Sequence, residues 1–179
     1  MGKWKIGDTS SDNKNKLKWN KFIIDNRVLL ISDRVILVNV SFNELNKYNL
    51  IYGKSVYIDK KKYKLRVLTG GIDCISFDND SKGTPGNEWD NFIINSKDIT
   101  NLIKPLYKIK EGLSNKDKLN LEHNKIWNWY NNFTICQEIR KGVYGDNTSA
   151  IIRGYISSVF WDILGTSEKG LEYGWRPVL

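Results

Sequence analysis

The chain has 179 residues, a hydrophobic fraction of 40% and a formal net charge of +8. This length fits one domain with a real core and leaves little room for a second. No apolar run approaches the roughly 18 residues of a membrane span, so membrane insertion is not expected. The positive charge permits a nucleic acid or an anionic surface as partner. However, the 20 acidic residues are interspersed with the 28 basic ones, so charge alone does not favour such a partner.

Residues 1–20 are polar and rich in Lys, Asn and Ser, and we interpret them as a leader before a single α+β domain over 21–179. The N-terminus lacks the apolar segment of a secretion signal. Ile6 stands where a myristoylation signal needs Ser or Thr. The sequence therefore predicts a protein made without a signal peptide.

β-branched residues dominate the segment 21–40, which is typical of strands. We predict three short strands there, at 22–24, 28–32 and 35–38. Ser41 and Glu44 have the spacing of a capping box, which predicts a short helix as far as Tyr48.

A hairpin is expected next, with strands at 55–58 and 63–68. The lysines of its turn Asp59-Lys60-Lys61-Lys62 are interpreted as solvated, and not as a basic site. A second short helix is predicted at 87–93 with Asn87 as its N-cap. Residues 96–123 are expected to form a long polar connection, a kind of segment that is usually functional or loosely ordered.

Aromatic and polar residues alternate from Trp127 to Tyr130, and this period of two predicts a strand. Two further strands are expected at 151–158 and 173–179, with loops at 141–149 and 162–172. The chain ends on Val-Leu, and an apolar end of this kind predicts that the last residues lie in the core.

Three short motifs carry a resemblance to a known family. They are Trp127-Asn128-Trp129, Arg153-Gly154-Tyr155 with Ser157, and Gly174-Trp175-Arg176-Pro177-Val178. This order resembles the C-terminal half of the formylglycine-generating-enzyme-like branch of the C-type lectin fold, over residues 124–179. The resemblance implies a C-type-lectin-like core of short twisted antiparallel strands, with two short helices and long loops. Earlier segments, such as 63–71 and 87–90, look like uncharacterised proteins of clostridial phages and prophages.

The catalytic residues of that branch are missing. Formylglycine generation requires a reactive cysteine pair near the C-terminal core, and no cysteine follows Cys136. Sulfoxide synthases on the same fold require several histidines, and His123 is the only one here. One histidine also falls short of the three or four ligands of a zinc site. The sequence therefore predicts the scaffold without catalysis, and Cys74 and Cys136 as two lone buried thiols in preference to a disulfide.

The acidic loop from Asp73 to Asp80 offers oxygen ligands of the kind that calcium prefers. It lacks the spacing of an EF-hand, so we interpret it as a solvated loop and predict no cofactor, with calcium as the open alternative.

Six residues form the predicted ligand-binding set: Trp161, Tyr155, Asp146, Asn147, Arg153 and Arg176. An exposed aromatic ring beside Asn and Asp side chains is suited to stacking on a sugar, although a core position for Trp161 is the other reading. The two arginines are expected to be structural, because an arginine between aromatic residues in a strand commonly pairs inside. The alternative for them is a pocket that grips an anion.

The favoured hypothesis is a non-catalytic binding module of phage or prophage type that recognises a cell-surface glycan or protein through its loops. The alternative is a phage-encoded intracellular inhibitor of host defence that binds a host protein, a nucleic acid or a nucleotide signal. The first would place the protein on a virion or other particle, and the second in the host cytoplasm.

Overall fold

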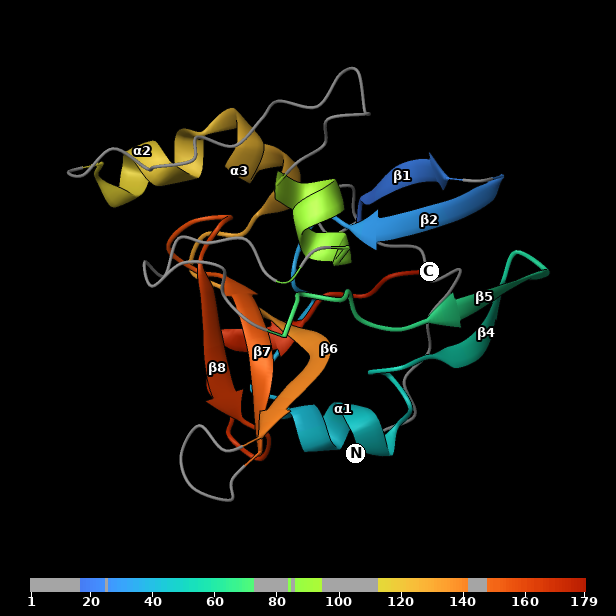
Figure 1. Cartoon of the computed structure of the whole chain (residues 1–179). Coiled ribbons are helices and arrows are strands. Elements are labelled where there is room, and N and C mark those ends of the chain that lie inside the picture. Colours follow the sequence, from blue (N-terminus) through green and yellow to red (C-terminus); the bar gives the residue numbers. More distant parts are fainter. Residues whose placement is uncertain (1–16, 25, 73–83, 85, 95–112, 142–147) are drawn as a thin grey trace.

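The computed structural model describes residues 17–24, 26–72, 84, 86–94, 113–141 and 148–179. These residues form a mixed α+β fold made mostly of strands, with a few short helices (Figure 1). The predicted α+β class is thereby confirmed. β1 begins at Trp19, inside the segment interpreted as a leader, and the Asp73–Asp80 loop lies outside the described residues.

A five-stranded sheet forms the centre of the fold, in the order β3-β9-β6-β7-β8. Its strands are β3 (Leu37–Val38), β9 (Tyr173–Trp175), β6 (Phe133–Lys141), β7 (Thr148–Gly154) and β8 (Trp161–Gly165). All neighbours are antiparallel except β6 and β9, which run parallel. The parallel pair departs from the all-antiparallel core that the family resemblance implies.

β7 is buried along almost its whole length. Ala150 and Ile152 point into one hydrophobic cluster, while Ile151, between them, points into another. Side chains alternate between the faces of a strand, so this division shows that core packs against both faces of the sheet.

Two hairpins extend from this body, β1 (Trp19–Ile24) with β2 (Arg27–Ser32), and β4 (Lys54–Ile58) with β5 (Lys61–Leu65). The last residues of the chain, Pro177 to Leu179, run between them (Figure 1). Leu179 exchanges two backbone hydrogen bonds with Leu30 of β2, and Val178 exchanges two with Arg66, directly after β5. The C-terminal segment therefore joins both hairpins into one hydrogen-bonded array.

The predicted first helix is present as α1 (Phe42–Lys47), and both bonds of its capping box between Ser41 and Glu44 form. The predicted second helix is a π-helix, η2 (Trp89–Ile94). Asn87 lies before it, and its side-chain oxygen accepts a hydrogen bond from the backbone N–H of Asp90 at 2.8 Å. This bond supports the predicted cap.

Two predictions of local structure between residues 96 and 130 were wrong. Within 96–123, predicted as a connection without helices, lie α2 (Asn115–Asn120) and the start of α3 (Glu122–Trp127). The predicted strand at Trp127–Tyr130 is the end of α3 followed by Asn128 in the left-handed conformation, with φ of 43°. Trp127 and Trp129 still enter the same hydrophobic cluster, because the left-handed residue reverses the chain between them.

The predicted loop at 162–172 was also partly wrong, since β8 occupies its first residues. β8 forms because it pairs with β7 from Ser149 to Arg153, a long-range contact that local composition does not reveal.

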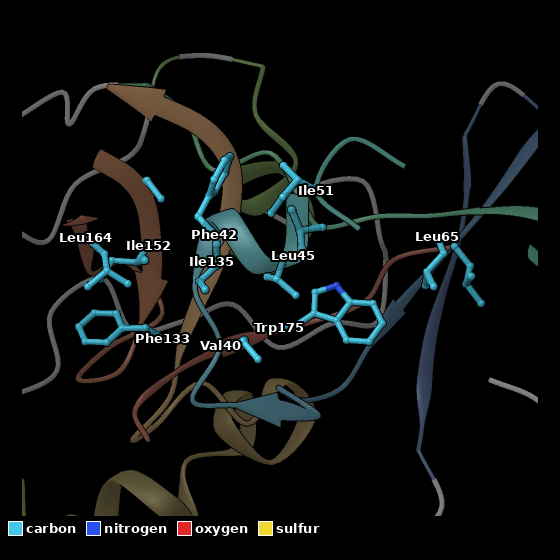
Figure 2. Packing of buried hydrophobic residues seen from close by; sticks show 13 residues of the cluster. Val40, Phe42, Leu45, Ile51, Leu65, Phe133, Ile135, Ile152, Leu164 and Trp175 are labelled. Atoms are coloured by element: carbon cyan, nitrogen blue, oxygen red, sulfur yellow. The ribbon is translucent and has the colours of Figure 1, made fainter. Parts of the chain in front are cut away.

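The face of the central sheet that carries Ala150 and Ile152 packs on α1. There, Phe42 and Leu45 of α1 meet Ile135 and Trp175 in the main core cluster (Figure 2). The last residues are buried, as their apolar character predicts.

Candidate functional site

The two arginines of the predicted binding set both lie near the ring of one tryptophan in the core. The guanidinium carbons of Arg153 and Arg176 lie 5.8 and 5.7 Å from the centre of the Trp89 ring. Cations at such distances are attracted to the face of an indole ring. Arg153 pairs with Asp90 at 2.9 Å and donates to the carbonyl oxygen of Gly70 at 2.8 Å.

Within the described residues, the hydrogen-bond partners of Arg176 are neutral groups. Its Nε donates to Oγ1 of Thr134, and its terminal nitrogens donate to the carbonyl oxygens of Ser32 and Asn128. Burial lowers the pKa of Arg176 to about 10, although Asp33 acts in the opposite direction. Both arginines are fully buried and bonded to protein groups, which supports the structural interpretation over a pocket that grips an anion.

His123 is buried, and both of its ring nitrogens are used. Its Nε2 donates to the carbonyl oxygen of Ile93 at 2.8 Å, and its Nδ1 accepts from the indole N–H of Trp129 at 2.9 Å. Burial lowers the pKa of His123 to about 4. The hydrogen bond to Ile93 acts to raise this pKa, and the charge of Arg176 acts to lower it. The imidazole is therefore neutral near pH 7 and ties η2 to the segment after α3.

This burial makes stability depend on pH. The folded pKa of about 4 lies below the ordinary 6.5, so the unfolded chain takes up the proton first. We expect His123 to lower the free energy of unfolding by about 3 kcal/mol as the pH falls from about 6.5 to about 4, with no effect above that window. Urea unfolding of the wild type and of His123→Gln across this range measures the difference. Parallel pH profiles for the two proteins would contradict the assignment.

Cys136 is fully buried in β6. Burial, together with the charge of Glu138, raises the pKa of its thiol well above the ordinary value. A thiol kept protonated is a poor nucleophile. Cys74 lies outside the described residues.

Trp161 is not available as an exposed platform. It opens β8, is only 7% exposed, and packs with Cys136 and Ile151. Its indole N–H donates to the carbonyl oxygen of Gly71 at 3.3 Å. The core reading of Trp161 is the one that the structure supports, because pairing with β7 turns the indole inward.

Asp146 and Asn147 of the predicted set lie outside the described residues. In the part of the chain that is described, no three His, Cys, Asp or Glu side chains are grouped so that they could hold a metal ion. Over the same residues, no helix combines the length and apolar character needed to cross a bilayer.

Tyr155 belongs to a partly exposed cluster of rings, which we call the aromatic patch: Phe133, Tyr155, Phe160 and Tyr173. Phe133 lies at its centre, with the Tyr155 ring stacked at 4.6 Å and 8° and the Tyr173 ring stacked at 5.4 Å and 25°. The sheet creates this arrangement, since Phe133 of β6 is the direct partner of Tyr173 in β9. Phe133 itself is buried, whereas the other three rings are half-buried.

The backbone of Tyr155 is held in an uncommon conformation. Gly154 and Tyr155 have φ of 98° and 81°, and these two left-handed residues end β7. The N–H of Tyr155 donates to the carbonyl oxygen of Trp129 at 2.8 Å, and its carbonyl oxygen accepts from Asn131 at 2.9 Å. Positive φ in a bulky residue persists only where surrounding bonds enforce it, and such residues cluster at binding sites.

Acidic side chains influence Tyr173, which belongs to the patch. Burial raises the pKa of Tyr173, and the negative charges of Glu172, Glu168 and Asp162 raise it further. The patch therefore consists of partly buried rings that also pack against the main core cluster.

Sequence reasoning found Tyr155 but missed Phe133, Phe160 and Tyr173. The high aromatic density near 127–133 was a signal that rings gather there. Only the parallel register of β6 and β9 brings Tyr173 onto Phe133.

Comparison of the chain with protein-family models, curated proteins and solved structures found no significant match. The resemblance to the formylglycine-generating-enzyme-like branch therefore stays a prediction.

Proposed function

We propose that the chain is a non-catalytic binding module that recognises a cell-surface glycan through the aromatic patch. The observation that carries the proposal is the pair of partly buried tyrosine rings stacked on Phe133, with acidic side chains whose charges raise the pKa of Tyr173. Sugars present apolar C–H faces and a rim of hydroxyls. Aromatic rings offer a platform for the apolar C–H face, and carboxylates accept hydrogen bonds from the hydroxyls.

The chemistry of the core supports binding more than catalysis. His123, Arg153, Arg176 and Asp90, which have the functional groups that catalysis often uses, are buried and bonded to protein groups. A C-type-lectin-like scaffold remains part of the proposal.

The proposal predicts a loss of binding in two variants. Tyr155→Ala and Tyr173→Ala are each expected to weaken binding to a glycan found on an array by at least about tenfold, equivalent to 1.4 kcal/mol. Tyr155→Phe keeps the stacked ring and is expected to bind within a few-fold of the wild type. Titration calorimetry with the selected glycan measures all three, and thermal melting checks that they fold.

Tyr52→Ala is the matched control, because this tyrosine is 49% exposed and lies outside the aromatic patch. It should leave binding unchanged. The proposal fails if the array yields no glycan, or if the folded Tyr155 and Tyr173 variants bind as tightly as the control.

A further inference from the structure

The β4–β5 hairpin is strongly basic. Residues 53–65 contain one acidic residue, Asp59, and five lysines, all exposed: Lys54, Lys60, Lys61, Lys62 and Lys64. None of these five ammonium groups forms an ion pair with a residue in the described ranges. The hairpin also projects from the body of the fold, at the side opposite β8 (Figure 1). Its charge is therefore available to an anionic partner.

One face of this hairpin presents a ring together with two of the lysines. Tyr57 lies directly opposite Lys62, and Ser55 lies directly opposite Lys64. Opposed residues on an antiparallel pair share a face, with their Cβ atoms about 5 Å apart. Lys62 and Lys64 follow one another on that face at about 6.8 Å. The Tyr57 side chain is 70% exposed, so its ring is open to a ligand.

The geometry of this face is fixed by local backbone features. Asp59 and Lys60 both have positive φ, 48° and 64°, and form a tight two-residue turn that sets the register of the strands. At the base, the aliphatic stem of Lys64 lies on Gly53, where an added Cβ would come within 2.2 Å of Cε.

We propose that this face of the β4–β5 hairpin binds single-stranded nucleic acid. Lys62 and Lys64 contact backbone phosphates, and an unpaired base stacks on the Tyr57 ring. Basic grooves with exposed aromatic rings bind single strands in this way, because every base has a π-face. A protein partner is disfavoured, since lysine is depleted at protein interfaces. This site shares no residue with the aromatic patch, so the nucleic-acid proposal and the glycan proposal can each be refuted without affecting the other.

Fluorescence anisotropy with a labelled oligothymidylate of about 12 nucleotides tests the proposal, with oligouridylate and a duplex as comparisons. The wild type should bind the single strands more tightly than the duplex. Its affinity should fall as salt is raised from about 50 to about 200 mM. Lys62→Gln with Lys64→Gln should reduce the slope of log affinity against log salt by about 1.4, since each phosphate contact to a single strand contributes about 0.7.

Tyr57→Ala should weaken binding by about 5- to 150-fold, the effect of losing one stacked base, with an unchanged salt slope. Tyr57→Phe should restore the affinity. The control is Lys47→Gln with Lys116→Gln, which removes two exposed lysines from α1 and α2 and should change the slope little.

Absence of binding at about 50 mM salt would overturn the proposal. It would also be overturned if the Tyr57→Ala protein bound normally, or if the control pair lowered the slope as much as the hairpin pair. Binding to anionic lipid vesicles without binding to oligonucleotides would assign the hairpin to a membrane surface instead.

Discussion

A chain that stops after Arg176 is expected not to fold. Pro177 to Leu179 make five backbone hydrogen bonds to Leu30, Ser32 and Arg66, and Val178 and Leu179 are buried. Each hydrogen bond contributes about 0.5–1.5 kcal/mol and each buried aliphatic side chain about 1.5–3 kcal/mol. Their sum exceeds about 5 kcal/mol, which is comparable to the whole stability of an ordinary domain. Circular dichroism and the dispersion of amide NMR signals measure the outcome.

The control for this truncation is Leu171→Ser, near the end of the chain. Leu171 is 75% exposed, so the substitution removes an apolar side chain that makes little contact with the core. It should change the free energy of unfolding by less than about 0.5 kcal/mol. A truncated protein with a cooperative melting transition near that of the wild type would show that the two hairpins do not depend on the C-terminal segment.

Asp90→Asn is expected to destabilise the protein by about 3–5 kcal/mol, because it removes the charge of one member of the buried Asp90–Arg153 pair. The substitution retains the size of the side chain, so the effect reports the lost charge and not a cavity. Asp90 also accepts a hydrogen bond from the amide of Asn87 at 2.7 Å, which an asparagine oxygen can still accept in one orientation. Urea unfolding gives the free energy difference.

Lys125→Ala provides the comparison for Asp90→Asn. It removes the partner of Glu122 in an ion pair whose two side chains are both exposed. We expect a change of at most about 1 kcal/mol, as for other surface pairs. Equal effects of the two substitutions would mean that the Asp90–Arg153 pair is better solvated than its burial indicates.

Local signals identified much of the framework. The capping box at Ser41 predicted α1, and the Asn87 cap predicted a helix that formed as η2. β-branched runs predicted the β1–β2 and β4–β5 hairpins to within a few residues. In each case the decisive chemistry lies within a few residues of sequence, which is why pattern alone sufficed.

Other elements depended on contacts that pattern does not carry. The alternation of Trp127 and Trp129 has the period of a strand, yet it arises from a helix end followed by the left-handed Asn128. Trp161 looked like a loop residue, but pairing with Arg153 places it in β8 and in the core. The aromatic patch needed both the β6–β9 register and the two left-handed residues after β7.

The sequence by itself determined the α+β class, the helix caps, the hairpins and the burial of the apolar C-terminal end, because propensity, capping and hydrophobic pattern act over short distances. Tertiary structure decided which polar groups serve the core and which face solvent. It placed Arg153 and Arg176 near the Trp89 ring, used both ring nitrogens of His123, and left Tyr57 exposed and three rings of the aromatic patch partly exposed. These assignments depend on strand order and register, which bring together residues from distant parts of the chain.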